Sequence, residues 1–167
     1  LFQMMAGACE ALREAKCALL GGHTCEGAEL SLGLSVVGQA RAASLLRKGG
    51  MRAGDAIILT KPIGTGALFA AHMRGAADGP AVAAAIDCMS RSNAAAAGLI
   101  GAHSGRSCTD VTGFGLLGHL HEMSIASNAR VRLRLSAVPL LPGVADCVKR
   151  GIFSSLQPSN LRLRRAL

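Results

Sequence analysis

The spacing of apolar and polar positions predicts helices separated by short strands. Apolar residues recur every three or four positions over residues 1–18, with charged residues between them, which is typical of an amphipathic helix. Similar patterns predict further helices over 81–101, about 114–127 and 143–150. Residues 60–66 are expected to open another helix, which ends at about Met73. Short apolar or alternating runs predict strands over 17–20, 30–38, 56–59, 130–135 and 161–165. This mixture predicts an α/β (α+β) fold.

Three glycine-rich polar segments, 21–29, 60–66 and 107–121, stand between the predicted elements. In the third, Asp110 and Thr112 precede a run of glycines that leads into a helical pattern. The free backbone N–H groups of a first helical turn and the positive end of the helix dipole favour an anion there. A carboxylate just before such a turn is placed to hold the divalent cation that accompanies phosphate.

Simpler interpretations of the third segment stay open. It also suits an ordinary strand-to-helix turn, in which Thr112 is the N-cap and the glycines allow tight packing. The pattern Gly113-x-Gly115-x-x-Gly118 matches the dinucleotide fingerprint. Arginines, however, stand where that motif requires an acidic residue about 20 positions later. A nicotinamide site is therefore not favoured.

The first two glycine-rich segments are similarly ambiguous. Residues 21–29 suit a phosphate held by backbone N–H groups, with His23 and Thr24 as side-chain donors. They equally suit a turn whose glycines supply positive φ angles. Lys61, in the second segment, suits either a phosphate contact or an exposed loop position. No Gly-Lys-Ser/Thr sequence closes that segment, which excludes a Walker A loop.

The composition indicates a globular protein whose C-terminal part is basic. Half of the 167 residues are apolar, and the aromatic residues are four Phe without Trp or Tyr. Residues 130–167 carry eight Lys or Arg against one acid, Asp146, which gives +7 of the net charge of +8. This asymmetry indicates polyanionic partners or acidic segments elsewhere. The lack of stacking aromatics argues against a nucleic-acid partner.

The six cysteines indicate reduced thiols in a cytoplasmic protein, because they form no CxxC pair and no secretory signal is recognisable. Cys108, His119 and His121 are zinc-binding residue types, but the paired spacing of zinc ligands is missing. No Gly-x-Ser-x-Gly elbow indicates a hydrolase, and no apolar run predicts a membrane span. Because Leu1 already lies within a helical pattern, we expect the chain to be part of a longer protein.

Three motifs, in the same order along the chain, resemble those of the selenophosphate synthetases, also called selenide, water dikinases. They are Gly21-Gly-His-Thr-x-Glu-Gly-Ala-Glu-Leu, Leu59-Thr-Lys-Pro-Ile-Gly-Thr-Gly66 and Thr109-Asp-Val-Thr-Gly-Phe-Gly-Leu-Leu-Gly-His119. The resemblance implies a reaction of ATP, selenide and water that requires Mg²⁺ and gives selenophosphate, AMP and phosphate. Selenophosphate is the selenium donor for selenocysteine and selenouridine.

The resemblance also implies a two-domain architecture like that of the aminoimidazole ribonucleotide synthetases. Residues 1–44 would be the end of an N-terminal ATP-binding domain that forms a homodimer. Residues 51–167 would be an incomplete C-terminal α/β domain. The implied partners are ATP, selenide and a second copy of the chain, and a selenium-delivery protein is a further candidate.

Site residues follow from the same resemblance. Gly21, Gly22 and His23 match the segment that reaches the nucleotide across the dimer interface, and Asp110 matches a metal-ligand aspartate. The family's glycine-rich segment with its Cys or selenocysteine, its catalytic lysine and its other metal-binding aspartates are expected upstream of Leu1. We therefore expect no catalytic residue here and no activity of this part alone. The alternatives are another ATP-dependent enzyme of the same architecture, or a non-catalytic dimerisation or regulatory module.

Overall fold

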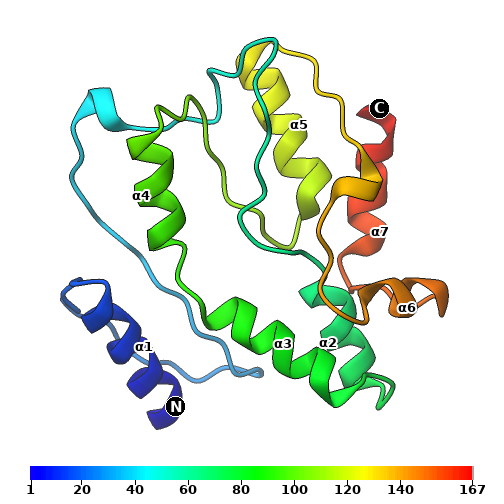
Figure 1. Ribbon diagram of the computed structural model, residues 1–167. Coiled ribbons are helices and arrows are strands. Elements are labelled where there is room, and N and C mark those ends of the chain that lie inside the picture. The colour runs from blue at the N-terminus through cyan, green and yellow to red at the C-terminus, as the bar shows by residue number, and fades with distance from the viewer. Residues whose placement is uncertain (167) are drawn as a thin grey trace. The chain divides into compact units, whose positions relative to one another are not determined.

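The computed structural model describes residues 1–166, and its chain divides into two compact units, Leu1–Gln39 and Ala40–Leu167. The first unit contains helix α1, Phe2–Glu14, followed by irregular chain (Figure 1). The amphipathic helix predicted over residues 1–18 is thus confirmed, with an earlier end. No residue of α1 is fully buried in the described structure, and Met4, Ala8 and Leu12 on its apolar side are half-buried.

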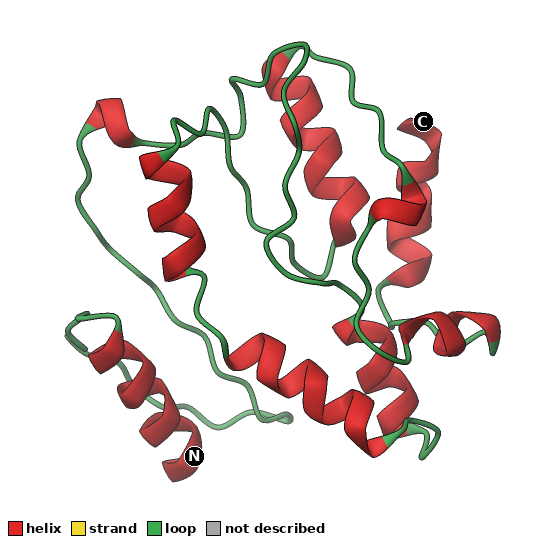
Figure 2. Ribbon diagram, viewed as in Figure 1, coloured by secondary structure: helices red, strands yellow, loops and turns green. Residues whose placement is uncertain are grey.

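The two strands predicted for the first unit are wrong, because residues 17–20 and 30–38 form loops (Figure 2). The N–H of Cys17 bonds back to the carbonyl oxygen of Leu12 at 2.8 Å, which makes it part of the end of α1. Leu30 and Leu34 are 71% and 60% exposed. Alternation assigns side chains to two faces, but a strand also needs a neighbouring backbone for its hydrogen bonds. Among the described residues, no neighbouring backbone pairs with residues 17–20 or 30–38 as a strand would.

Helices form the regular structure of the second unit (Figure 2). The helices predicted over 114–127 and 143–150 are confirmed to within one residue at each end. The helix expected to open within residues 60–66 begins at Thr65 and ends at Met73, as predicted. In chain order the unit contains η1 (Ala42–Ser44), α2 (Thr65–Met73), α3 (Gly79–Ser90), α4 (Ala94–Ala102), α5 (Gly115–Ser127), η2 (Leu135–Ala137), α6 (Val144–Lys149), α7 (Gln157–Asn160) and η3 (Leu161–Ala166).

The single long helix predicted over 81–101 is wrong, because the chain breaks it into α3 and α4. The ammonium group of Lys61 donates hydrogen bonds to the carbonyl oxygens of Cys88 and Arg91, which caps the C-terminal end of α3. The hydroxyl of Ser92 then accepts the N–H of Ala94 at 3.1 Å, at the start of α4. A distant lysine and a local serine therefore stabilise a break that alanine propensity alone does not predict.

The strands predicted for the second unit are also wrong. Residues 56–59 and most of 130–135 are irregular, and the helical elements α7 and η3 replace the strand expected over 161–165. Among the described residues, parallel pairing is limited to the isolated bridges Arg47↔Ser107 and Ile63↔Leu140. One bridge does not extend into a ladder, so these segments stay unpaired. The α/β expectation therefore holds only in part, since the fold is rich in helices.

Packing explains why residues 157–166 are helical. The positions of Leu156 and Leu163, seven residues apart, place both beside the glycines of the α5 segment. A Cβ atom at Gly113 would lie 2.5 Å from Leu156 Cδ1, and one at Gly118 would lie 3.0 Å from Leu163 Cδ1. A helical conformation thus places Leu156 and Leu163 on the same side, against these glycines, whereas an alternating strand would place them on opposite faces.

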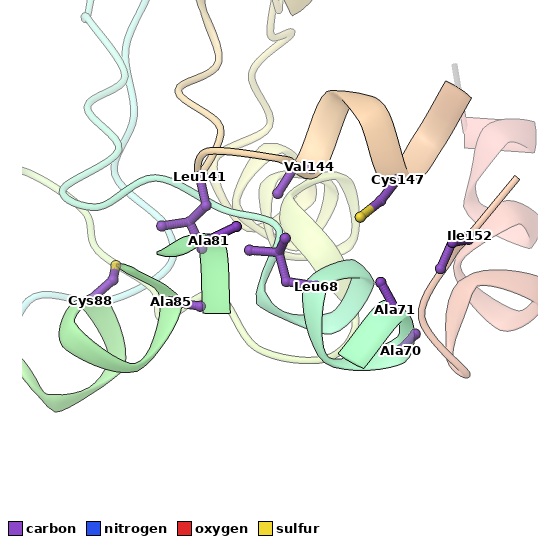
Figure 3. Close-up of a cluster of buried hydrophobic side chains, with 10 residues drawn as sticks. All are labelled: Leu68, Ala70, Ala71, Ala81, Ala85, Cys88, Leu141, Val144, Cys147 and Ile152. Atoms are coloured by element: carbon purple, nitrogen blue, oxygen red, sulfur yellow. The ribbon is translucent and has the colours of Figure 1, made fainter. Parts of the chain in front are cut away.

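The core of the second unit lies between α2, α3 and α6 (Figure 3). Small residues from α2 and α3 surround Leu68, which is 1% exposed and contributes about 1.5–3 kcal/mol by its burial. Gly64 has a φ of 121°, and a Cβ atom there would lie 2.3 Å from Val144 Cγ2, so glycine is required at the start of α2. The core residues are Leu68, Ala70, Ala71, Ala81, Ala85, Cys88, Leu141, Val144, Cys147 and Ile152.

Candidate functional site

Asp110 lies on a loop that is held at both ends. Before it, the N–H of Cys108 donates to the carbonyl oxygen of Arg47 at 2.9 Å. After it, Thr112 is bound by the imidazole of His119. The Asp110 side chain itself is 73% exposed, and its described hydrogen-bond partner is the hydroxyl of Thr109, at 3.4 Å from Oδ1. The structure therefore presents a carboxylate to solvent from a fixed backbone.

His119 is buried in α5, at 6% exposure, and its two ring nitrogens have different environments. Its Nε2 lies 3.1 Å from the backbone N and 3.0 Å from the Oγ1 of Thr112. A backbone N–H can only donate, so Nε2 is an acceptor and the neutral ring carries its proton on Nδ1. Among the described residues, Nδ1 has no hydrogen-bond partner.

Two carboxylates face this Nδ1 atom beyond hydrogen-bond distance. Asp110 Oδ1 lies 4.0 Å from it and Glu122 Oε2 lies 3.7 Å from it. Glu122 is already paired, because Lys48 Nζ lies 2.5 Å from the same Oε2 atom. The hydrogen bond from Lys48 lowers the pKa of the Glu122 carboxyl, and its positive charge acts in the same direction. Glu122 therefore stays ionised beside the buried ring.

The segment around Lys48 is attached to α5 at several points. The N–H groups of Gly50 and Met51 both donate to Ser127 Oγ at 3.1 Å. A Cβ atom at Gly49 would lie 2.6 Å from the backbone oxygen of Ala126, so the backbones approach closely there. Residues 47–51 thus connect the start of the Asp110 loop to the end of α5.

The interpretation of Thr112 as the N-cap of the helix is wrong. Phe114 is the N-cap residue of α5, without a side-chain hydrogen bond, and the Thr112 hydroxyl contacts His119 instead. The expected tight packing of the glycines is present, since Gly113 and Gly118 lie against Leu156 and Leu163. Packing within the chain therefore accounts for two glycines of the dinucleotide-like pattern.

Gly21, Gly22 and His23 lie in the loop of the first unit, whereas Asp110 belongs to the second. All three loop residues are exposed. Neither glycine has a positive φ, and a Cβ atom at either would meet no described atom within 4 Å. A turn that needs glycine for positive φ therefore does not explain this pair.

Lys61 is neither a free loop lysine nor an open anion contact. It is half-buried, and its Nζ lies 3.1 Å from the carbonyl oxygen of Cys88 and also bonds that of Arg91. A hollow of about 370 Å³ lies beside it, lined in part by α3 and by the start of α4. The role that the structure gives to Lys61 is to cap α3.

The described residues provide a single carboxylate for a cation and not a complete metal centre. No group of three or more His, Cys, Asp or Glu in the described part of the chain is arranged so that it could hold a metal ion. The exposed oxygens of Asp110 nevertheless suit Mg²⁺, which takes one or two protein carboxylates and completes its shell with water and phosphate oxygens. Within residues 1–166, no helix has the length and apolarity needed to cross a membrane.

Sequence reasoning found Asp110 but missed the groups behind it. His119 was considered only as a zinc ligand, and Glu122 and Lys48 were not considered. The i, i+3 spacing of His119 and Glu122 was a local signal for their proximity. Lys48 is 74 positions away from Glu122, so no local pattern indicates that ion pair.

Comparisons with known proteins identify the family. Residues 52–146 match the family described as AIR synthase related protein, C-terminal domain. The selenide, water dikinases of Trichlorobacter lovleyi and Geobacter metallireducens are each 45% identical over 152 residues, covering 91% of this chain and 44% of the relative. That of Porphyromonas gingivalis is 35% identical over 162 residues, covering 97% and 47%.

The chain thus spans somewhat less than half the length of the curated relatives it matches. The expected resemblance to the selenide, water dikinases is confirmed. An aminoimidazole ribonucleotide synthetase-like fold is supported by the same family match, which covers more than half of the chain. Through this match over residues 52–146, the chain belongs to the family described as AIR synthase related protein, C-terminal domain.

Proposed function

We propose that this chain is part of a selenide, water dikinase, which converts ATP, selenide and water to selenophosphate, AMP and phosphate. The observation that carries the proposal is the similarity to proteins of that name, at 45% identity over 91% of the chain. Phosphoryl transfer of this kind depends mainly on positioning and on stabilising charge, rather than on covalent chemistry by the protein.

Asp110 is the residue that we assign to metal binding. Bound Mg²⁺ would neutralise charge on the transferring phosphates. The chain's own contribution is to hold the Asp110 backbone between the Arg47 bridge and the contact of Thr112 with His119. Because the loop is fixed before any ligand arrives, little ordering is left for the moment of binding.

Gly21, Gly22 and His23 are assigned to ATP. Their exposure and the absence of a local packing reason for the two glycines support a role in contacting another molecule. Consecutive glycine N–H groups suit phosphate, because no side chain blocks the approach. We further propose that a second copy of the chain completes the nucleotide site in a cytoplasmic homodimer, and that a selenium-delivery protein supplies selenide.

The proposal is tested by product analysis of the protein that carries this chain. The protein is incubated anaerobically with ATP, selenide and Mg²⁺, and the products are followed by ³¹P NMR. The expected result is selenophosphate, AMP and phosphate in equal amounts, with no selenophosphate when selenide is omitted. ATP turnover to ADP that ignores selenide would instead favour another ATP-dependent enzyme of the same architecture. No turnover by a folded, ATP-binding protein would favour a non-catalytic module.

A further inference from the structure

The unpartnered Nδ1–H of His119 is the feature of the described structure that packing does not explain. The ring is nine-tenths buried, and a buried donor without an acceptor is unfavourable. Its other nitrogen is fully used, since Nε2 accepts from the backbone N–H of Thr112. The ring is therefore held in one tautomer, with its remaining proton directed to the side of α5 where two carboxylates lie.

The two carboxylates differ in their freedom to reach that proton. Oε2 of Glu122 is bound by Lys48 at 2.5 Å, so its position is already determined. Asp110 makes no contact with a Lys or Arg among the described residues, and its side chain is 73% exposed. A small rotation of Asp110 suffices to shorten the 4.0 Å separation between Oδ1 and Nδ1 to a hydrogen bond.

We propose that His119 is a positioning residue for Asp110. Its Nε2 fixes the Thr112 backbone, and its Nδ1–H donates to one oxygen of Asp110 when the carboxylate is ordered by a cation. The other carboxylate oxygen is then directed outward. Carboxylates that bind metals are commonly oriented by such a second hydrogen bond. The tautomer follows from the contacts above, whereas the pairing with Asp110 in the presence of a cation rests on the proposed function.

Lys48 has a supporting part in this arrangement. By holding Glu122, it leaves the Nδ1–H of His119 to Asp110. It also balances one of the two negative charges that lie beside the ring. This role explains why a basic residue of the 47–51 segment is attached to α5 at this point.

The test compares substitutions that remove one ring function at a time. His119→Gln keeps an acceptor near the position of Nε2 but has no donor at that of Nδ1, and His119→Leu removes both. His121→Gln is the control, because His121 lies on the same helix and makes no side-chain hydrogen bond in the described structure. Hydrogen exchange of the Thr112 amide, Mn²⁺ binding followed by electron paramagnetic resonance, and turnover are measured for each variant.

The expected result separates the two ring functions. His119→Gln keeps the Thr112 amide protected and weakens Mn²⁺ binding and turnover about 10- to 100-fold. His119→Leu loses amide protection as well, and His121→Gln resembles the wild type. Normal Mn²⁺ affinity in His119→Gln would overturn the proposal. Loss of amide protection in that variant would also overturn it, because the effect would then be structural.

An NMR experiment tests the pairing without reference to activity. The Nδ1–H resonance of His119 is compared in the wild type, Asp110→Asn and Glu122→Gln, with Mn²⁺ replaced by diamagnetic Mg²⁺. The proposal predicts that Mg²⁺ shifts this resonance in the wild type and in Glu122→Gln but not in Asp110→Asn. The same response in all three proteins refutes the pairing. If Mg²⁺ does not bind the wild type, the proposed metal site is wrong. The pairing is then judged without metal, and it is refuted if Asp110→Asn leaves the Nδ1–H resonance of His119 unchanged.

Discussion

Gly49→Ala tests whether residues 47–51 pack against α5 as the structure describes. The φ angle at this position lies outside the left-handed region, so alanine is permitted by the backbone itself. Its Cβ atom, however, would lie 2.6 Å from the backbone oxygen of Ala126 and 3.2 Å from that residue's carbonyl carbon. A backbone oxygen cannot swing aside as a side chain can, so the whole segment must shift.

Two terms set the magnitude for Gly49→Ala. Overpacking of this kind costs about 1–3 kcal/mol, and weakening the bonds of Gly50 and Met51 to Ser127 costs about 1 kcal/mol more. Alanine also lowers the conformational entropy of the unfolded chain, which offsets about 0.4–1 kcal/mol of this loss of stability. We therefore expect a net loss of about 1–4 kcal/mol in the free energy of unfolding, measured by urea denaturation.

Gly98→Ala is the matched control for this prediction. It makes the same chemical change in the exposed middle of α4, where a Cβ atom would meet nothing described within 4 Å. Helix propensity then favours alanine, and the variant should be more stable by up to about 1 kcal/mol. The reasoning is refuted if Gly49→Ala is as stable as the wild type while the control gains stability.

Three further predictions follow from the core, from the ion pair and from the extent of the chain. Leu68→Ala should lower the free energy of unfolding by about 2–5 kcal/mol, because it leaves a cavity in the buried core; a loss below 1 kcal/mol in urea would contradict this packing. Lys48 lowers the pKa of Glu122 in the folded state, so the pair stabilises the protein above the ordinary glutamate pKa and this contribution disappears as the pH falls through the lowered value. Glu122→Gln should therefore reduce the acid-side dependence of stability, and unchanged acid denaturation would argue against the pair. The isolated 167-residue chain should form no AMP from ATP and selenide, because it offers one carboxylate and no metal cluster among its described residues; AMP formation by it would refute that expectation.

Helices were predictable from the sequence where the signal was local. The helical patterns of residues 114–127 and 143–150 lie within each segment, and both helices are confirmed to within one residue at each end. The break between α3 and α4 was not predictable, because the cap from Lys61 comes from about 30 positions away. The strand prediction over 161–165 is wrong for a similar reason, because the contacts of this segment with the glycines of the α5 segment depend on the tertiary structure.

The same division applies to the candidate site. The position of Asp110 before a glycine-rich helix start could be predicted from its motif. The arrangement behind it could not, because the partner of Glu122 lies 74 residues away and the tautomer of His119 depends on the fold of the loop. The domain assignment of residues 1–44 and 51–167, and the roles of Gly21, Gly22 and His23, stay predictions.

Asp110 is proposed to hold the cation needed for selenophosphate formation, and a comparison of two aspartate variants tests this role. Asp110→Asn and Asp146→Asn are made in the protein that carries this chain; both aspartates are exposed, at 73% and 72%. Selenophosphate formation is measured by ³¹P NMR over a range of Mg²⁺ concentrations. We expect Asp110→Asn to lose at least about 100-fold in turnover without loss of stability, whereas Asp146→Asn keeps normal turnover. Normal, Mg²⁺-dependent selenophosphate formation by Asp110→Asn would contradict it.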